Sequence, residues 1–538
     1  MSYRSKDQSS KNPKPKKGWS LWSNFPRQPI QERILDGIPG FIAWFALLYS
    51  VASAVAFPKT LLAFSAAIGL YSSIRFTIAA YANQRGIRQI QEWKERDWHQ
   101  HYLTEKDSSS MIWEDVQHIV IIPNYKEPQE ILIRTLDNLK AQYEAKKRIT
   151  IVLAMEENEE NCEKKANFLV AKYQNAFKNV FYTIHPANLP GEIQCKSANE
   201  AWAGKWIKQF LIDQQSQNIH HYCLTTQDAD TRWDKNYFYC LTALFALNPN
   251  RYEYFWQAPI RYHGNIWDIN PLMRIVNAFA TAMEAAYLAN PLWLALPMSS
   301  YSLSLKLLDE SAYWDGDVIA DEWHMFIKAF FFKKSKVKLE AIMLPFLADA
   351  TVGDNIWQAI KERYKQTLRH AWGSKEVGYT VAKIIDNPDI PIKPSIRLLL
   401  RIAHDILLAG AGWVILTVGS QLPVLLHPEI APFTLEALFQ APNPIMFALE
   451  KTLINPSWFI LSLASLLVIL MGMVFWYQDV LVRPPRTKKR TIKETALTLI
   501  SFPLLPVLSL LVLALPTIQA QTKLLLGIPL QFKVTRKS

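Results

Sequence analysis

Cysteine is scarce in this sequence, and its spacing argues against two kinds of site. The 538 residues include 4 cysteines, and none of them form a Cys-x-x-Cys pair. Both a disulfide framework and a cysteine-ligated metal cluster usually show closely spaced or repeated cysteines. We therefore expect reduced, structural thiols at Cys162, Cys195, Cys223 and Cys240.

Charge is nearly absent from several long hydrophobic runs. The first run, residues 40–57, has no charged side chain, and the second, residues 60–82, has only Arg75. An α-helix needs about 20 apolar residues to cross a hydrocarbon core about 30 Å thick. Together these runs predict an integral membrane protein, with a buried core helix as the alternative for any one run and above all for the proline-interrupted last one. The later runs are residues 406–426, 457–477 and 495–520.

The first run lacks the small-residue cleavage site of a secretory signal, so it is predicted to be a retained anchor. The net charge of +12 does not predict nucleic-acid binding, because basic residues cluster in segments 3–19 and 483–493, beside hydrophobic runs. Such clusters mark the cytoplasmic side. We expect a multi-pass protein of the cell (inner) membrane whose middle segment, residues 83–395, is cytoplasmic.

The number of crossings near the C-terminus stays open. Five crossings would leave the basic segment 532–538 outside, against the rule that places basic segments in the cytoplasm. Pro503, Pro506 and Pro516 permit a broken or re-entrant helix that returns the tail to the cytoplasm.

These runs divide the chain into segments. An apolar stretch at 271–297 is predicted to be a core and membrane-surface helix, because Arg274 and Glu284 are costly in lipid. The predicted order is a basic cytoplasmic tail (1–38), a transmembrane helical hairpin (39–82), an interfacial helix and linker (83–114), an α/β domain (115–380), a linker (381–395), C-terminal transmembrane helices (396–520) and a basic tail (521–538).

Strand and helix patterns alternate in the middle segment. The stretch "HIVIIPNYKE" starts with a continuous apolar run typical of a buried parallel strand, "EILIRTLDNLKAQ" has helical spacing, and "RITIVLAMEENEE" predicts a second buried strand. This alternation predicts a Rossmann-like α/β domain with a mostly parallel sheet, inserted between transmembrane helices.

Acidic residues follow the predicted strands. In "HYCLTTQDAD", Asp228 and Asp230 lie at i and i+2 of an extended segment, so their carboxylates point to the same side and repel each other. Glu156 and Glu157 end the second strand, at the edge where parallel sheets bind ligands. A divalent metal is the expected partner, with a turn or helix-cap role for the aspartates and a solvated helix start for the glutamates as alternatives.

With these residues, the chain resembles the membrane-integrated inverting family 2 glycosyltransferases of GT-A type, the group that includes cellulose and hyaluronan synthases. The resemblance covers about residues 115–380. It implies a nucleotide-sugar site in which "IIPNYKE" cradles the base and Glu156 or Glu157 replaces an aspartate that contacts uracil. In "IIPNYKE" the residues concerned are Pro123, Tyr125 and Glu127.

Two further motifs imply the diphosphate and metal site. "GEIQCKSANEA" resembles a segment that places Lys196 near the diphosphate and Asn199 beside the nucleotide. "DAD" is similar to the DxD motif, which implies that Asp230 ligates Mg²⁺ or Mn²⁺. Asp228 is then expected to contact the nucleotide sugar and to belong to the same metal site. Hard oxygen ligands suit these ions, which neutralise a departing diphosphate.

The segment "GDVIADEWHMFIK" lies where the family has its catalytic base. The Glu-Asp order of the family is reversed here, so the resemblance puts Glu322 on the base position and Asp321 on its partner. Both begin a predicted helix, whose dipole is expected to lower their pKa. A helix cap is the alternative role for Asp321.

The segment "KERYKQTLRHAWG" resembles the QxxRW motif of processive synthases. It implies that Gln366, Arg369 and Trp372 contribute to the nucleotide-sugar site, although His370 replaces the tryptophan of the motif. Arginine suits a diphosphate because its planar fork donates two parallel hydrogen bonds. An amphipathic interfacial helix is the alternative interpretation.

Together, the resemblance implies a metal-dependent enzyme that moves a hexose from a nucleotide-diphosphate sugar to a lipid-linked or growing glycan acceptor at the cytoplasmic membrane face. A processive polysaccharide synthase that also secretes its product is the alternative. A transporter and a non-catalytic nucleotide-sugar sensor are alternatives from other classes. Membrane lipids are expected partners, and nucleic acid is not.

Overall fold

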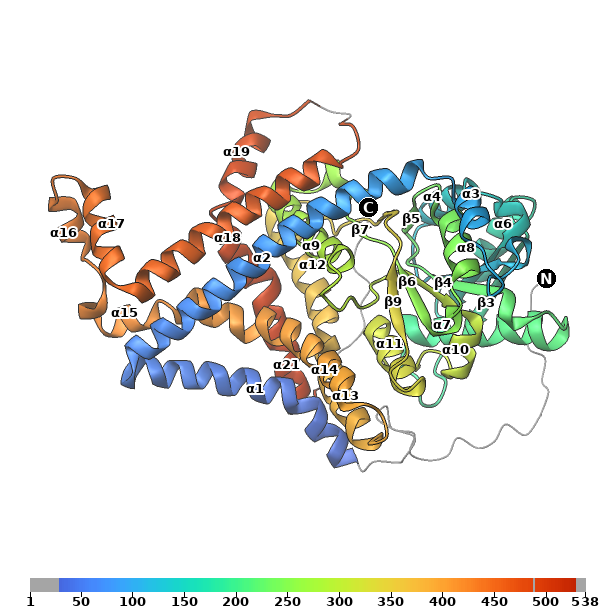
Figure 1. The fold of residues 1–538 in the computed structure, drawn as a ribbon, viewed down its shortest axis with the longest axis horizontal. Helices are drawn as coiled ribbons and strands as arrows, with labels where there is room; N and C mark the ends of the chain where they lie inside the picture. Colours follow the sequence, from blue (N-terminus) through green and yellow to red (C-terminus); the bar gives the residue numbers. More distant parts are fainter. Residues whose placement is uncertain (1–28, 487–488, 529–538) are drawn as a thin grey trace.

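The computed structural model describes residues 29–486 and 489–528. The basic segments predicted at 3–19 and 532–538 lie outside the described residues, as do two residues of segment 483–493. Figure 1 shows an α/β part, which contains the strands, beside a part made of long helices.

A seven-stranded sheet forms the centre of the α/β part. Its strand order is β3-β2-β1-β4-β8-β6-β9. Strands β3, β2, β1 and β4 are parallel to one another, as are β6 and β9, whereas β8 runs antiparallel to β4 and β6. The predicted mixed α/β fold with a mostly parallel sheet is confirmed. The strands are β1 (Gln117–Pro123), β2 (Ile149–Glu156), β3 (Asn179–His185), β4 (Tyr222–Thr226), β6 (Tyr254–Gln257), β8 (Tyr301–Ser304) and β9 (Lys338–Ala341).

A three-stranded sheet lies beside the large one, and it carries segments that follow β4 and β6. Its order is β5-β10-β7. Phe346 of β10 pairs with Trp233 of β5 in antiparallel register and with Ile260 of β7 in parallel register. The strands are β5 (Arg232–Trp233), β7 (Ile260–Arg261) and β10 (Phe346–Leu347).

Alternation along the central strands separates two hydrophobic cores. In β1, Val120 and Ile122 pack with α4 (Gln129–Lys140), α6 (Cys162–Tyr173) and α8 (Tyr237–Leu247). Ile119 and Ile121 point to the other face, against α7 (Lys196–Lys208) and α11 (Asp321–Phe332). Both faces are covered, which explains the continuous apolar pattern of β1.

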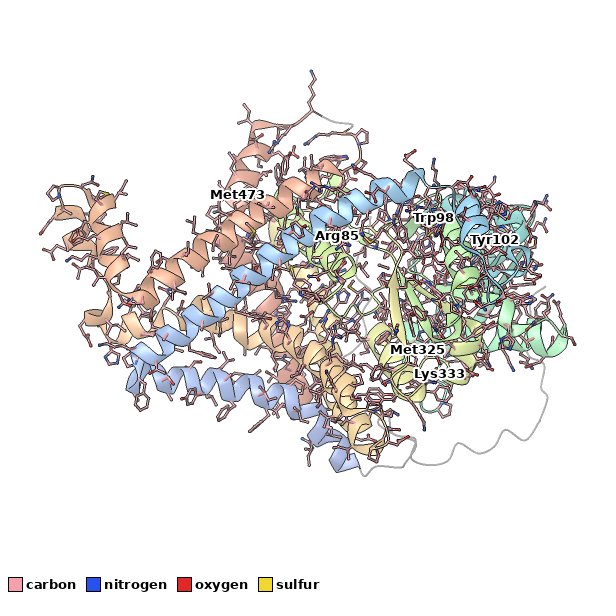
Figure 2. The ribbon with its side chains drawn as sticks, viewed as in Figure 1. Arg85, Trp98, Tyr102, Met325, Lys333 and Met473 are labelled. Carbon is pink, nitrogen blue, oxygen red and sulfur yellow. The ribbon has the colours of Figure 1, made fainter. Side chains whose placement is uncertain are left out.

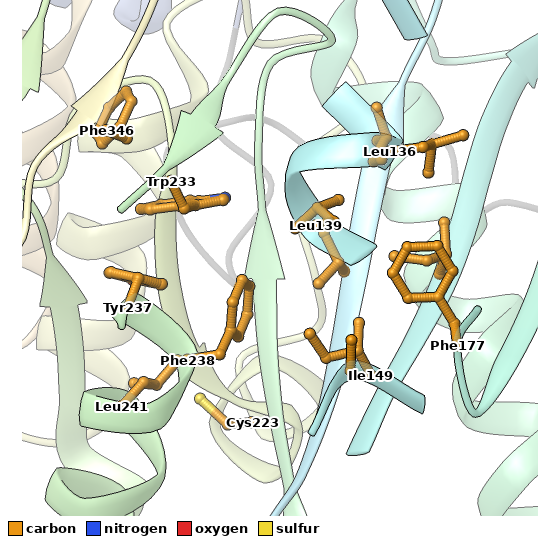
Figure 3. Packing of buried hydrophobic residues seen from close by; sticks show 14 of the residues in the cluster. Leu136, Leu139, Ile149, Phe177, Cys223, Trp233, Tyr237, Phe238, Leu241 and Phe346 are labelled. Atoms are coloured by element: carbon orange, nitrogen blue, oxygen red, sulfur yellow. The ribbon is translucent and has the colours of Figure 1, made fainter. Parts of the chain in front are cut away.

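Figure 3 shows part of the first core, where Leu136 and Leu139 of α4 lie near Ile149 and Phe177. Trp233 stacks on Tyr237 with ring centroids 3.9 Å apart. Cys223 lies in the same core, and all four cysteines are buried and free, as predicted.

Four described helices are long and apolar enough to cross a membrane, namely Glu32–Ala56, Pro58–Glu95, Pro456–Leu481 and Leu505–Leu526. A pair bent by 42°, Ile392–Gly412 with Ile415–Leu426, would be a fifth span. These spans support the predicted membrane protein. Met473, on the long helix α18 (Pro456–Leu481), is 41% exposed, whereas Trp98 and Tyr102 are buried in the α/β part (Figure 2).

The boundary predicted at residue 83 is not a helix break. Helix α2 (Pro58–Glu95) continues through it, and a separate short helix, α3 (Trp98–Glu105), follows. Helix α1 (Pro29–Ala56) begins within the segment predicted as a tail. Helix α9 (Pro271–Ala289) is not among the candidate spans, in agreement with its predicted core role.

The last hydrophobic run is broken into α19 (Ile492–Ser501), α20 (Leu505–Ser509) and α21 (Leu515–Leu526). Near its start, Glu494 forms an ion pair with Arg274 of α9. At its end, the Leu526 carbonyl accepts a hydrogen bond of 3.3 Å from Arg33, in the first turns of α1. Those turns also contact α13 (Lys375–Asp386), where Lys375 lies 3.4 Å from Asp36. Both ends of the run therefore lie beside segments that border the α/β part.

Candidate functional site

A cavity of about 400 Å³ opens at the carboxyl ends of β1, β2 and β4. Helix α7 and helix α11 contribute to its wall through their first residues, and α12 (Ile356–His370) contributes through its last turns. Most of the predicted site residues line this cavity: Pro123, Tyr125, Glu127, Glu156, Lys196, Asn199, Asp228, Asp321, Glu322, Gln366 and Arg369.

One of the two glutamates at the end of β2 faces the cavity. Glu156 is 4% exposed and lines it, with His185 Nδ1 at 3.1 Å from its carboxylate. His185 also lies 2.8 Å from Glu192, and these two carboxylates overcome burial and raise the His185 pKa to about 9. Glu157 instead accepts a hydrogen bond of 2.8 Å from the Ala187 amide and does not line the cavity. Glu157 is exposed, which agrees with the alternative that this glutamate belongs to a solvated helix start.

The Lys196 ammonium lies among four carboxylates. Its Nζ is 3.1 Å from Asp228, 3.6 Å from Glu200, 3.8 Å from Asp321 and 3.6 Å from Glu322, and it donates a 2.9 Å hydrogen bond to the Ser299 carbonyl. The surrounding negative charge raises the Lys196 pKa despite burial. Residues predicted from three separate motifs therefore meet at one point.

The two aspartates of "DAD" have different surroundings. Asp228 is 30% exposed, lines the cavity and accepts a 2.8 Å hydrogen bond from the Ser299 hydroxyl. Asp230 is 1% exposed and accepts the Asp349 amide at 2.9 Å, and it does not line the cavity. The next helix, α8, begins at Tyr237 with Asn236 as its cap, so neither aspartate caps a helix, whereas the Asp228 carbonyl accepts a 3.0 Å hydrogen bond from the Thr231 amide and closes a turn.

Asp349, which the sequence analysis missed, faces the cavity beside this pair. It forms ion pairs with Arg134 and Arg232. Burial and the nearby Asp230 raise the pKa of Asp349. Asp349 follows β10, and no motif near it in the sequence signals a site.

Asp228 is a hard oxygen ligand at the cavity surface and suits a divalent cation bound jointly with a substrate, whereas the buried Asp349 carboxylate is paired with Arg134 and Arg232. Asp228 and Asp349 line the same cavity, and Asp230 lies against the Asp349 backbone. Within residues 29–486 and 489–528, no group of three or more acidic, histidine or cysteine side chains could hold a metal by itself. Mg²⁺ commonly takes one or two carboxylates together with substrate phosphates and waters.

The expected low pKa of the two carboxylates in α11 is wrong. Burial raises the pKa of Asp321 to about 8 and that of Glu322 to about 7, and Lys196 offsets only part of this increase. The helix dipole is a small effect compared with desolvation of a buried carboxyl group. Helix α11 begins at Asp321 with Ala320 in the cap position, so the cap alternative for Asp321 is also wrong.

Glu200 is a second buried acid that the sequence analysis missed. It is fully buried on α7, where it accepts a hydrogen bond from Thr226. A hydrogen bond with Asp321 and the neighbouring Lys196 both lower the pKa of Glu200, yet burial still raises it overall. Its position four residues after Lys196, on the same helix face, was the available signal.

The QxxRW segment forms the end of α12 and the turn Ala371–Ser374. Gln366 and Arg369 line the cavity, as does His370, which replaces the tryptophan of the motif. Trp372 does not line it. The predicted contribution of Trp372 to the cavity is therefore not seen.

No family model matches this chain, and no curated protein matches it. Several solved structures resemble it weakly. Mannosyltransferase PcManGT from Pyrobaculum calidifontis, in complex with GDP-Man and Mn²⁺, is 15% identical with a TM-score of 0.39, over 75% of this chain and 98% of that one. S. aureus TarS 1-349 with UDP-GlcNAc is 10% identical with a TM-score of 0.30, over 68% and 88%. GalNAc-T7 with UDP, GalNAc and Mn²⁺ is 12% identical with a TM-score of 0.32, over 56% and 58%.

Proposed function

We propose that this chain is a membrane-anchored, inverting glycosyltransferase that moves a hexose from a nucleotide-diphosphate sugar to a lipid-linked or growing glycan acceptor. One observation carries the proposal, namely that Lys196, Asp228 and Glu322 meet in one cavity at the carboxyl edge of the sheet. Ligands of open parallel sheets bind at this edge. The transfer takes place at the cytoplasmic membrane face.

The nucleotide lies against the loop after β1 and the end of β2 in this proposal. Pro123, Tyr125 and Glu156 line that part of the cavity, and Asn199 braces β2 by donating a 2.8 Å hydrogen bond to the Ala154 carbonyl. The diphosphate lies near Lys196 and Arg369, the cationic side chains of the wall. Arginine and lysine both bind phosphate oxygens through charged hydrogen bonds.

Asp228 is the carboxylate best placed to hold Mg²⁺ or Mn²⁺ together with the diphosphate. Asp349 lines the same cavity, and Asp230 accepts a hydrogen bond from the Asp349 amide. The ion, when bound, would neutralise negative charge that develops on the leaving diphosphate. Lys196 supplies positive charge at the same point, because it lies 3.1 Å from Asp228.

Glu322 is the proposed catalytic base. Its side chain is 24% exposed to the cavity, whereas Asp321 is only 4% exposed and faces Glu200. Glu322 takes the proton of the acceptor hydroxyl, the acceptor oxygen forms a bond to the anomeric carbon, and the bond from that carbon to the diphosphate breaks. A single displacement of this kind inverts the anomeric configuration. A base with a pKa of about 7 is well matched to such a proton transfer.

The shape of the cavity supports an acceptor held at the membrane. Ile406 of α14 (Ile392–Leu407) lines it, and α14 is the first arm of the bent candidate span. Glu284 of α9 lines it too, and α9 packs against α2 and α18. The cavity therefore connects the sheet edge with the helical part.

A donor screen tests this proposal. Purified full-length protein with Mn²⁺ or Mg²⁺ is given a panel of nucleotide sugars together with membrane lipid extract, and the released nucleoside diphosphate is measured. We expect release from one donor class, strong loss in Glu322→Gln, and unchanged release in the control Glu436→Gln, whose side chain is exposed far from the cavity. No release from any donor, or full turnover in Glu322→Gln, would contradict the proposal.

The reaction product shows whether the anomeric configuration is inverted and whether one sugar or a polymer is added. Proton NMR of the product reports the anomer and so tests inversion. One added sugar indicates single transfer, whereas a ladder of products indicates a processive synthase.

A further inference from the structure

The cavity wall includes polar side chains that the proposed chemistry does not use. We call these the helical wall, defined as Tyr262, Glu284, Gln366 and Trp323. Glu284 comes from α9 and Gln366 from α12, whereas Trp323 directly follows the proposed base Glu322. Glu322 and this wall line the same cavity, so an acceptor bound at Glu322 lies close to them.

Glu284 is the most unusual member of the helical wall. It lies on an apolar helix next to Ala285 and Ala286, which are fully buried. Its Oε2 atom is buried and has no hydrogen-bond partner. An unpaired buried polar atom costs about 1–3 kcal/mol, so its presence in a cavity wall calls for a ligand.

Two arginines near Glu284 also have unused hydrogen-bonding capacity. Arg261 is 2% exposed, and neither of its Nη atoms has a hydrogen-bond partner. Arg363 donates a 2.9 Å hydrogen bond to Gln366 from Nη1, while its Nε is buried without a partner. Glu284 lines the cavity with an unused acceptor, and the two arginines lie behind it, close enough to lower its pKa.

Burial raises the pKa of Glu284 to about 8, and Arg363 and Arg261 lower it only in part. Most of the Glu284 carboxyl groups are therefore neutral at pH 7, and a neutral carboxyl group both donates and accepts hydrogen bonds. A carboxyl group, an amide and two aromatic rings are suited to the hydroxyl groups and apolar faces of a sugar ring. A phosphate group could accept a hydrogen bond from the neutral carboxyl group, but it has no apolar face and would leave both aromatic rings without a partner.

We propose that Glu284, together with Gln366, Tyr262 and Trp323, forms a subsite for a sugar ring of the acceptor. The acceptor is then a glycan or glycoside, and its reactive group is a sugar hydroxyl rather than a lipid phosphate. This inference rests on the proposed function and narrows the class of its acceptor.

A binding experiment tests the subsite without any donor turnover. Full-length protein in nanodiscs, free of glycoside detergents, is mixed with a panel of methyl glycosides and disaccharides, and binding is measured by saturation-transfer NMR. We expect saturable binding of at least one sugar, at least tenfold weaker in Glu284→Ala and within threefold of the native affinity in Glu284→Gln, which keeps a planar hydrogen-bonding group. The control is Glu92→Gln, an exposed acid on α2.

Each outcome decides the inference. No saturable sugar binding, or equal binding in Glu284→Ala, overturns the subsite even if the chain turns over a nucleotide sugar. Glu284-dependent binding supports the subsite even if the donor screen fails, so the two proposals fail separately. Stimulation of donor turnover by a short-chain prenyl phosphate alone, and by none of the sugars, also overturns the inference. Size-exclusion profiles identify any variant that has not folded.

Discussion

At the residue scale, the balance of charge around Lys196 governs the proposed chemistry. One ammonium lies within 3.8 Å of four carboxylates, so it cannot neutralise all of them. Burial and mutual repulsion raise the pKa of Asp321 and Glu322, and these groups bind protons near neutral pH. The protonation state of the cluster therefore changes within the pH range of an ordinary assay.

The first prediction concerns the pH dependence of transfer. A base must be deprotonated to act, so kcat/KM should fall as the pH decreases below about 7, the pKa of Glu322. Glu322→Gln should lose about 10²–10⁴-fold in kcat, the usual contribution of general base catalysis. Initial rates between pH 5 and 9 measure both effects.

Asp321→Asn provides the matched control. With a pKa of about 8, Asp321 is largely neutral where Glu322 titrates, so its replacement by a neutral amide should leave the acidic limb near pH 7 while activity persists. An inactive Asp321→Asn variant with an active Glu322→Gln variant would reverse the assignment of the base.

The sequence predicted this cluster in part. The motifs around Lys196, Asp228 and Glu322 are local patterns, and each was recognisable from neighbouring residues. Glu200, Asp349 and Glu284 were missed because their importance depends on which distant segments surround them. The pKa direction was wrong for the same reason, since burial is a property of the folded chain and not of a helix start.

At the scale of single elements, His324 connects α11 to its surroundings. Its Nδ1 lies 3.0 Å from Glu376 of α13, and its Nε2 lies 2.9 Å from Asp315 in the preceding loop. Lys328 also contacts Asp315 at 2.6 Å, and the Tyr379 ring packs on the imidazole at 4.1 Å. These contacts hold the first turn of α11, which carries Asp321 and Glu322.

The second prediction concerns stability and pH. The two carboxylates raise the His324 pKa to about 9, above the 6.5 expected in the unfolded chain. A raised pKa means that the stabilisation is complete below pH 6.5 and is lost as the pH rises through 9. Thermal unfolding of the full chain in nanodiscs should show a decreasing midpoint over this range.

His324→Asn tests the source of that decrease. It leaves the buried Glu376 without its partner and should cost about 3–5 kcal/mol, the usual effect of breaking a buried ion pair. The variant should also show a flatter dependence on pH than the native protein. An equal effect in His427→Asn, whose ionic partner is 71% exposed, would contradict this role.

The third prediction concerns the contact between α1 and α13. A Cβ atom at Gly378 would lie 2.2 Å from the Leu35 carbonyl oxygen, so the two helices must separate in Gly378→Ala. Overpacking of this kind costs about 1–3 kcal/mol. The yield of folded protein and its unfolding midpoint should both decrease.

Gly419→Ala is the control for that variant. Its Cβ would have its nearest contact at 3.6 Å, an ordinary van der Waals distance. Alanine also has the higher helix propensity, so stability should be unchanged or slightly higher. Similar losses in both variants would indicate a general sensitivity of the helices to substitution.

At the scale of the whole molecule, contacts at the ends of the helices indicate which ends share a side. His427, which follows the bent span, contacts the Val55 carbonyl at 3.1 Å near the end of α1. The start of α1 and the end of α21 contact each other through Arg33 and Leu526, beside α13. We infer that α19 to α21 enter and leave on the side of the α/β part. Leu505–Leu526 then does not cross, although it is long and apolar enough, and the four crossings are α1, α2, the bent span and α18.

The fourth prediction follows from this topology. With four crossings, a C-terminal fusion should lie on the same side as the catalytic domain, in agreement with the basic tail. A fluorescent protein fused at the C-terminus should be bright, and a periplasmic phosphatase fused there should be inactive. The reverse pattern would indicate a fifth crossing and contradict the inference.

A cysteine introduced at Thr434, which is exposed between the bent span and α18, should be labelled from the opposite side by a membrane-impermeant maleimide. The native cysteines are all buried, so background labelling should be low. The sequence left the number of crossings open because hydropathy reports only the length and composition of an apolar run. The contacts of Arg33 and Glu494 depend on the packed helices.

The large-scale organisation was the most predictable part. Long uncharged runs and continuous apolar strands follow from solvent and sheet geometry, and they needed no distant contact to be recognised. The segment boundaries were less predictable, since α2 continues to Glu95 and is not interrupted at residue 83. A long helix can extend beyond a membrane without a break signal in its sequence.

The most direct test of the central claim is a cryo-EM structure of the full chain in nanodiscs with Mn²⁺ and the nucleotide sugar selected by the donor screen, using Glu322→Gln to slow turnover. We predict density for the diphosphate between Lys196 and Asp228, with the sugar beside residue 322. Nucleotide density bound elsewhere on the chain, with this cavity empty, would contradict the account.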